Sequence, residues 1–248
     1  MRFRSLSGAI LAAVLAGGSV PVFAETPATI AAAVADPARP AADVARDADR
    51  KPLETLAFSE VKPGDTVLEL IPAGGYFTRL LAKAVGPTGL VLAASPAVVP
   101  GSDKVAKEIA ADPRYGNVKA VGFDGPTLMD PQQVDVIFTA QNYHDLHLTQ
   151  AKQDVPLLDR LFFDKLKPGG LLIIIDHAAL PGSPVVATAN TLHRIDPAAV
   201  KAEVEGAGFV FDGESTVLRN PADPHTKIVF DPSIRGKTDQ FMFRFKKP

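Results

Sequence analysis

Short apolar runs recur along the chain and alternate with segments of helical periodicity. Five runs have the length and continuity of strands buried on both faces; they cover residues 67–71, 90–94, 118–121, 134–140 and 171–175. Apolar residues at helical spacing lie between them, over residues 77–85, 104–110 and 155–166. This alternation predicts an α/β fold, with a doubly wound, mostly parallel sheet covered by helices on both faces.

The C-terminal part of the chain has a different pattern. Residues 197–207 read as a helix that ends near Gly206 and Gly208, and residues 209–218 and 240–245 alternate like antiparallel strands, which predicts a C-terminal hairpin. The intervening residues 219–238 show no periodicity. Loops of that length in a compact domain are usually functional or disordered, so we expect this one to act as a lid over a site.

The first residues have the layout of a secretory signal peptide. Arg2 and Arg4 precede an apolar run over residues 6–16, and small residues lead up to Ala24. We expect residues 1–24 to be cleaved after Ala24, because the run is short for a membrane anchor, and the protein to be periplasmic or secreted. An Ala- and Pro-rich arm, expected to be loosely held, follows over residues 25–45, then a helix over 42–58 within a single domain over 46–248.

Composition narrows the classes of function. The chain has 248 residues, 46% of them hydrophobic, and a formal net charge of −2. That is enough apolar material for one core, and the absence of a basic excess argues against nucleic acid as a partner. Since no cysteine is present, disulfides and thiol nucleophiles are excluded. We therefore expect a small-molecule substrate, and no membrane partner after cleavage.

The turn after the first predicted strand is a candidate ligand cradle. It reads Pro72-Ala73-Gly74-Gly75-Tyr76, and adjacent glycines allow close approach of a ligand to the backbone. The usual phosphate-binding signatures of dinucleotide and triphosphate sites are absent. Glu69 lies within the preceding apolar run, where a buried carboxylate needs a partner. It could hold the turn or a cationic amino group, or pair on the surface with Arg79 or Lys83.

The densest polar cluster follows the fourth predicted strand and reads "TAQNYHDLH". Its members are Gln141, Asn142, Tyr143, His144, Asp145 and His147. His144 is the best candidate for a general base, because an unperturbed imidazole titrates near neutrality. A metal bound by His144, Asp145 and His147 is an alternative, but their spacing matches no zinc signature, so we expect no metal.

Other polar residues also follow predicted strands. Asp124 after the third strand could accept from an exocyclic amine or simply form a turn, and His177 follows the fifth strand. His193 and Arg194 could anchor an anionic substrate. Asp196 before Pro197 is explained structurally, as a helix N-cap.

These motifs together resemble the S-adenosylmethionine-dependent methyltransferases with a seven-stranded, doubly wound sheet. The resemblance covers roughly residues 60 to 245 and depends on "VLELIPAGGYFTRLL" and "LKPGGLLIIIDH". More narrowly, the chain resembles a group of exported bacterial predicted methyltransferases that share the Tyr-His-Asp segment and a "RNPADPHTKIVFDPSIRGKTDQF" end.

The resemblance implies a cofactor, S-adenosylmethionine, and roles for the candidate residues. Glu69, Pro72, Gly74 and Gly75 would line its methionine end, Asp124 would approach the adenine, and Gln141 to Tyr143 would approach the methyl group. The residues expected to bind the cofactor are Glu69, Pro72, Ala73, Gly74, Gly75, Tyr76, Ser95, Asp124, Gln141 and Asn142. The residues expected to be catalytic are His144, Tyr143 and Asp145. The residues expected to bind the substrate are His177, His193 and Arg194.

Three positions depart from the family pattern. Ile71 and Ala73 replace glycines, and Ser95 stands where many members place a carboxylate against the ribose. Loss of a charge-assisted hydrogen bond costs about 1.5–3 kcal/mol, so weaker cofactor binding is expected. Two hypotheses follow: a methyltransferase acting on a small molecule, in which His144 or Tyr143 assists deprotonation, or a non-catalytic periplasmic ligand-binding protein with a degenerate cofactor site.

Overall fold

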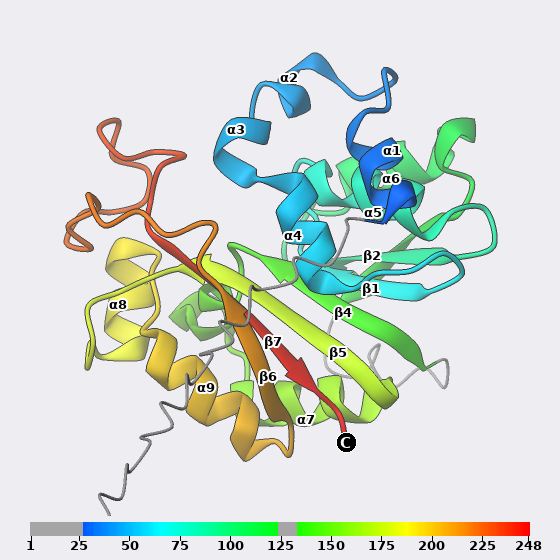
Figure 1. Ribbon diagram of the computed structural model, residues 1–248. Helices are drawn as coiled ribbons and strands as arrows, with labels where there is room; N and C mark the ends of the chain where they lie inside the picture. Colours follow the sequence, from blue (N-terminus) through cyan, green and yellow to red (C-terminus); the bar gives the residue numbers. More distant parts are fainter. Residues whose placement is uncertain (1–26, 124–132) are drawn as a thin grey trace, which may run out of the picture.

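A seven-stranded sheet runs through the part of the chain that the computed structural model describes, residues 27–123 and 133–248 (Figure 1). The spatial order is β3-β2-β1-β4-β5-β7-β6. The strands are β1 (Thr66–Leu70), β2 (Leu90–Pro96), β3 (Val118–Phe123), β4 (Val134–Ala140), β5 (Leu166–His177), β6 (Val210–Ser215) and β7 (Gln240–Lys246). The first five are parallel, and β7 pairs antiparallel with both β5 and β6. The predicted α/β fold is confirmed, including its C-terminal antiparallel strands.

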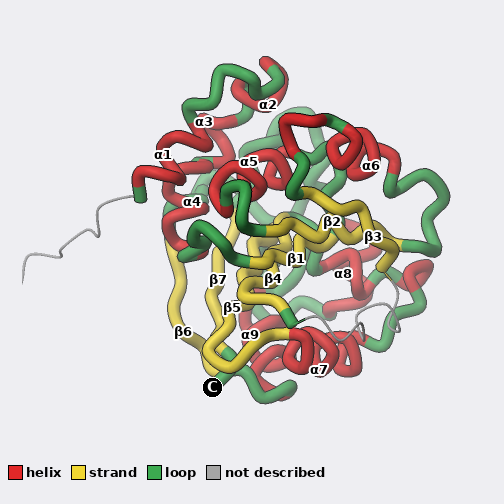
Figure 2. Tube along the Cα trace, turned by 90° about the vertical axis from the view of Figure 1, so that its right-hand side faces the viewer, coloured by secondary structure: helices red, strands yellow, loops and turns green. Residues whose placement is uncertain are grey.

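Helices cover both faces of the sheet (Figure 2). One face carries α1 (Ala28–Val34), α4 (Pro52–Ser59), α5 (Tyr76–Val85) and α6 (Lys104–Ala111), and the other carries α7 (Val155–Lys165), α8 (Val185–Leu192) and α9 (Pro197–Gly206). Successive strand residues contribute to the two cores in turn, since Val67 packs on the α5 side and Leu68 on the α7 side. This explains why the strands read as continuous apolar runs.

The segment before the sheet differs from the expectation in two ways. The helix expected over 42–58 is divided into α2 (Ala41–Val44), α3 (Asp47–Arg50) and α4. The break between α3 and α4 lies at Lys51, whose φ is 46°, because the following Pro52 disfavours helical backbone in the residue before it. The arm expected to be loose also packs against the sheet layer, since α1 buries Ile30 against α5.

Residues 219–238 contain neither helix nor strand, as expected. Two buried aspartates hold this segment in place: Asp223 pairs with Arg194, and Asp239, directly after the segment, pairs with Arg219. The sequence pattern did not predict α8, which precedes Arg194. Across residues 27–123 and 133–248, no helix is long and apolar enough to cross a membrane.

Candidate functional site

Two neighbouring cavities lie at the carboxyl ends of the central strands. The first, here called the arm cavity, has a volume of about 280 Å³ and is lined by residues from α3, β1, β4, β5 and the 219–238 loop. The second, the β2 cavity, has a volume of about 520 Å³ and extends towards the end of β2. Both are lined by Ile71, Pro72, Ala73 and Asp145. This edge is where open α/β sheets bind ligands.

Left-handed backbone is concentrated around the arm cavity. Ile71, Ala73, Gln141 and His193 all line it, and their φ values are 52°, 47°, 66° and 53°. For a residue with a Cβ this conformation costs roughly 1–2 kcal/mol, and such strain tends to gather at functional sites. Ile71 and Ala73, which the resemblance would place at glycine positions, therefore have the left-handed backbone that favours glycine.

Glu69 is buried at the wall of the arm cavity, with an exposed fraction of 4%. Its Oε2 has no hydrogen-bond partner among the described residues, and burial raises its pKa to about 7. The alternative of a surface ion pair is wrong, because Arg79 pairs with Asp43 and Lys83 with Asp36. The free carboxylate oxygen suits a cationic ligand group.

Most residues of the turn after β1 line the arm cavity, and one packs against a helix instead. Pro72, Ala73, Gly74 and Tyr76 line the arm cavity. Gly75 does not line either cavity; its φ is 74°, and a Cβ there would lie 2.2 Å from the Cδ1 atom of Ile109. Gly75 thus has a packing role against α6, and its contact with the cofactor stays a prediction.

His144 opens a 3-10 helix, η3 (His144–His147), and faces two carboxylates. Its Nδ1 lies 2.7 Å from Oδ1 of Asp176, and its Nε2 lies 3.1 Å from Oδ1 of Asp145. Burial lowers the pKa of His144, but the charge of Asp176 and the hydrogen bond to Asp145 outweigh it and raise the pKa to about 10. The two carboxylates therefore favour the protonated ring in the free protein, which opposes the expected role of general base.

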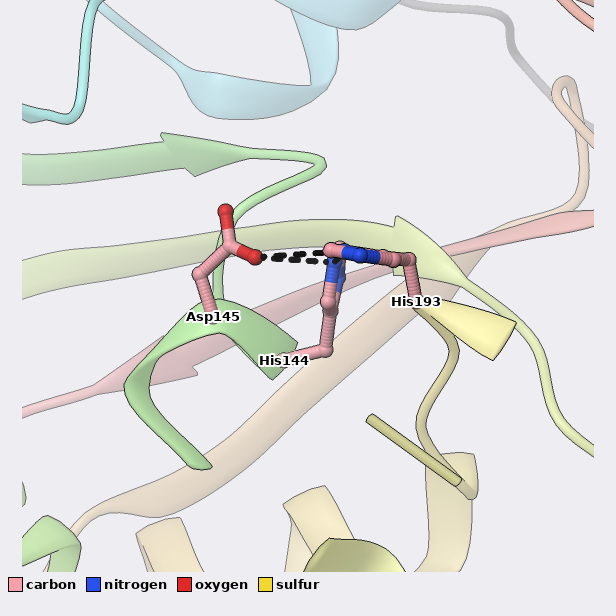
Figure 3. Close-up of side chains that lie close together, drawn as sticks. All are labelled: His144, Asp145 and His193. Carbon is pink, nitrogen blue, oxygen red and sulfur yellow. Dashed lines mark hydrogen bonds and ion pairs between the residues drawn. The ribbon is translucent and has the colours of Figure 1, made fainter. Parts of the chain in front are cut away.

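His193 completes this cluster from the end of α8. Its Nδ1 lies 3.3 Å from Nε2 of His144 and 3.6 Å from Oδ1 of Asp145. Figure 3 shows the three side chains converging on one another. All three also line the arm cavity.

Two expected site residues point elsewhere. Tyr143 is 1% exposed, its hydroxyl donates to Asp159 at 2.9 Å and lies 3.2 Å from Glu203, and it lines neither cavity. Arg194 is fully buried and donates to the carbonyls of Ala178 and Lys227 while pairing with Asp223. It therefore secures the 219–238 loop and does not anchor a substrate.

His147 is likewise absent from the cluster. It lies 3.2 Å from Glu203, on the α9 side of η3, which rules out the alternative of a metal held by His144, Asp145 and His147 together. The sequence spacing alone did not show that His147 faces away from His144 and Asp145.

Three of the remaining predicted residues line a cavity, and the fourth cannot be placed. His177 lines the arm cavity, bonds to Thr238, and has its pKa lowered to about 4 by burial, so it is neutral. Ser95 lines the β2 cavity, and its buried Oγ has no partner among the described residues. Asn142 donates to the carbonyls of Ile71 and Ala140 and thereby braces the turn. Asp124 lies outside the described residues.

The sequence did not predict the contribution of α3. Arg46 and Arg50 line the arm cavity, and Arg50 donates to Oε1 of Gln141 at 2.7 Å. The Arg50 guanidinium also lies 4.8 Å from the centre of the Tyr76 ring, and burial lowers its pKa to about 10. No pattern in the short, charged segment of α3 indicates that its arginines line a cavity.

Comparison with known proteins agrees with this architecture. No protein-family model matches the chain. The ubiquinone/menaquinone biosynthesis C-methyltransferase UbiE of Ectopseudomonas mendocina is 33% identical over 135 residues, which is 54% of this chain. The chain spans about half the length of that curated relative, 49% of it.

Solved structures are similar over most of the chain. An S-adenosylmethionine-dependent methyltransferase from Aquifex aeolicus has a TM-score of 0.56 at 21% identity, over 81% of this chain and 89% of that one. Fibrillarin from Aeropyrum pernix, solved with bound S-adenosylmethionine, has a TM-score of 0.53 at 16% identity, over 81% and 76%. The chain therefore has the fold of the S-adenosylmethionine-dependent methyltransferases.

Proposed function

We propose that the protein is an S-adenosylmethionine-dependent methyltransferase that acts on a small molecule. The observation that carries the proposal is the pair of cavities that share the β1–α5 turn at the carboxyl ends of β1, β2 and β4. Each has a buried polar atom in its lining residues that lacks a partner among the described residues, Glu69 Oε2 in one and Ser95 Oγ in the other. The fold and the relatives support the same cofactor.

The lining residues fit that cofactor. Ser95 in the β2 cavity can exchange a hydrogen bond with a ribose hydroxyl, and Glu69 in the arm cavity can pair with the amino group of the methionine end. The cofactor would supply an electrophilic methyl group. Ala73 lines both cavities, so a cofactor that occupies both would pass beside it.

The arm cavity also supports a small acceptor. Its volume of about 280 Å³ lies near the lower end of the range for small-molecule sites, and α3 and Phe230 contribute to its walls. Arg46 and Arg50 would favour an acceptor with an anionic or strongly polar group. Catalysis would come mainly from aligning the acceptor with the methyl group. Within this site Asp145 could accept a hydrogen bond from the acceptor, while His144 holds Asp145 in place through its Nε2 atom.

We also propose that the protein acts in the periplasm after cleavage behind Ala24, a proposal that depends only on the pattern of residues 1–24. Cell fractionation combined with N-terminal sequencing of the isolated protein tests it. A protein that retains its first residues in the cytoplasm would contradict it.

A second candidate is a non-catalytic binding protein on the same fold. It is favoured by Ala73 with a left-handed φ of 47° and by Ser95 where a carboxylate is common in the family. Under this hypothesis the cavities bind a ligand other than S-adenosylmethionine.

Calorimetric titration with S-adenosylmethionine and S-adenosylhomocysteine distinguishes the two. We expect micromolar binding, weakened roughly fivefold by Ser95→Ala, since one neutral hydrogen bond contributes about 1 kcal/mol. Ser183→Ala is the matched control, because its hydroxyl bonds to the Leu180 carbonyl on the surface. No detectable binding at millimolar ligand would contradict the methyltransferase proposal and favour the second candidate.

A further inference from the structure

We propose that His144, Asp145 and His193 bind a divalent transition-metal ion at the wall of the arm cavity. The proposal depends on the geometry of these three side chains and not on cofactor binding or methyl transfer. In this proposal His193, which lies 49 residues from His144 in the chain, takes the place of His147 as the second histidine ligand.

The three ligand atoms have the spacing of a shared coordination sphere. Nε2 of His144, Oδ1 of Asp145 and Nδ1 of His193 are separated by 3.1, 3.3 and 3.6 Å. The point equidistant from them lies about 1.9 Å from each, so an ion slightly above their plane reaches the ~2.0–2.2 Å of zinc–nitrogen and zinc–oxygen bonds. The side chains therefore need little movement to bind an ion, and binding releases to solvent the proton that His144 Nε2 directs at Asp145.

The ring of His144 is held as a metal ligand requires. Its Nδ1 faces the fully buried Asp176, which also accepts from the backbone N–H groups of His144 and His177. A carboxylate behind the second ring nitrogen is the usual outer-shell partner of a metal-bound histidine, because it fixes the ring orientation. The Nε2 atom is consequently directed at Asp145 and His193.

His193 adopts a strained conformation that brings its ring to the cluster. It lies directly after α8 with a φ of 53°, and its ring packs 5.0 Å from that of Phe230. Backbone strain of this kind persists where the surroundings fix it, commonly at a binding site. A structural role at the end of α8 would be met as well by glycine or asparagine.

The donor set indicates the kind of ion. Two imidazoles and one carboxylate suit zinc, iron, cobalt or manganese better than magnesium or calcium, which prefer oxygen ligands. Three protein ligands leave at least one coordination position open. Because all three line the arm cavity, that position faces the cavity, where Asp145 and the nearby Asp176 balance the positive charge of the ion. If the proposed function holds, the ion would polarise an acceptor oxygen or nitrogen.

The test is metal titration of the full chain after removal of metal by a chelator. Calorimetry with Zn²⁺ and absorption spectroscopy with Co²⁺ report affinity, stoichiometry and coordination. We expect one ion per chain and Co²⁺ bands typical of nitrogen and oxygen ligands. Asp176→Asn should weaken binding roughly 10–100-fold, as loss of an outer-shell partner does, and removal of a direct ligand should weaken it further.

The variants are chosen so that the fold survives. His193→Gly removes a ligand where the left-handed backbone favours glycine, and Asp145→Asn keeps the shape of the side chain. His147→Gln is the matched control, since His147 lies on the same 3-10 helix but faces Glu203. We expect both ligand variants to lose Zn²⁺ binding and the control to keep it, with circular dichroism unchanged in all three.

Equal Zn²⁺ affinity in the wild type and His193→Gly, or no binding by the wild type, would overturn the proposal. Dependence on His147 in place of His193 would also overturn it. Titration with S-adenosylmethionine is performed separately on the metal-free protein. Its outcome tests the proposed function alone, so failure of one proposal is distinguishable from failure of the other.

Discussion

At the scale of single residues, the arm cavity is lined by residues with strained backbone and by a buried carboxyl group. Ile71, Ala73, Gln141 and His193 adopt left-handed backbone around one space, and the carboxyl of Glu69 is buried beside it. Each feature lowers the stability of the free protein. Their coincidence at one wall is expected where stability is exchanged for ligand binding.

Ala73→Gly should raise both stability and cofactor affinity. The substitution removes a Cβ from a residue with φ 47° that lines both cavities, so we expect the free energy of unfolding to rise by about 1 kcal/mol. Urea unfolding and calorimetry measure the two effects. Ala202→Gly, on the exposed side of α9, is the control and should lower stability by about 1 kcal/mol. Lower stability of Ala73→Gly would contradict the strain argument.

Glu69→Gln should stabilise the protein at pH 8 while weakening cofactor binding. Burial raises the pKa of Glu69 from 4.5 to about 7, so its contribution to stability is full below pH 4.5 and is lost as pH rises through 7. The neutral glutamine avoids this loss, and we expect a gain of roughly 2–3 kcal/mol at pH 8 and little change at pH 4.

Urea unfolding at the two pH values measures the effect, with Glu214→Gln on exposed β6 as the control. Wild-type affinity for S-adenosylmethionine should also rise roughly tenfold between pH 5.5 and pH 7, because the ionised carboxylate attracts the amino group. If the affinity of the wild type for S-adenosylmethionine does not change with pH, Glu69 does not contact the ligand.

At the scale of elements, α3 is joined to the β1–α5 turn by side-chain contacts. The Tyr76 hydroxyl donates to Oδ1 of Asp47 at 2.6 Å, and Arg39 donates to the same carboxylate. Arg50 connects the same helix to Gln141 after β4. These contacts place the arginine-bearing end of α3 beside the cavity, and weakening them should loosen this helix.

Tyr76→Phe should release α3 without disturbing the sheet. The variant keeps the buried ring and loses a hydrogen bond to a charged acceptor, so we expect a loss of about 1–2 kcal/mol. Hydrogen–deuterium exchange should become faster over residues 41–50 and remain slow in β1 and β4. Unchanged exchange in α3 would show that Arg39 and Arg50 suffice to hold it.

Arg194→Met should be among the most damaging single substitutions. It leaves Asp223 buried without its partner, and breaking a buried pair in this way typically costs about 3–5 kcal/mol. Thermal unfolding measures the loss, and exchange should rise over residues 219–238. Lys201→Met breaks the more exposed pair with Glu214 and should cost less than about 1 kcal/mol. Similar effects of the two variants would contradict the role assigned to Arg194.

At the scale of the whole molecule, two buried aspartates connect the 219–238 loop to the domain. Burial raises the pKa values of Asp223 and Asp239, but hydrogen bonds from Arg194 and Arg219, and from backbone N–H groups, outweigh it and lower both below 3.8. A lowered pKa contributes stability that is present above pH 3.8 and lost as pH falls through the folded-state value.

Acid should therefore release this loop first. We expect the contribution of this loop to stability to be constant between pH 5 and pH 4 and to fall progressively below about pH 3.8, with early exchange over residues 219–238. Acid titration followed by circular dichroism, with exchange measured at pH 3, provides the readout. Loss of structure that begins above pH 5, or in the central strands, would contradict this account.

Local pattern predicted the sheet, because strands covered on both faces must be apolar along their whole length. The parallel order then brings every strand's carboxyl end to one edge, and for this reason Glu69, Asn142, His144 and His177 could be expected near one site. The strand β5 is longer than its apolar run, since Leu166 already pairs with Val134 and the register shifts before Leu171 pairs with Val136.

Tertiary structure alone decided which polar side chains meet. Tyr143 and His144 are neighbours in sequence, yet one points to Asp159 in the core and the other to the cavity. Arg50 reaches Gln141 across 91 positions, and His193 reaches His144 across 49. Such contacts depend on how separate helices pack, which periodicity does not encode. The sequence by itself therefore determined the sheet and the edge where the site lies, while packing determined the composition of the site.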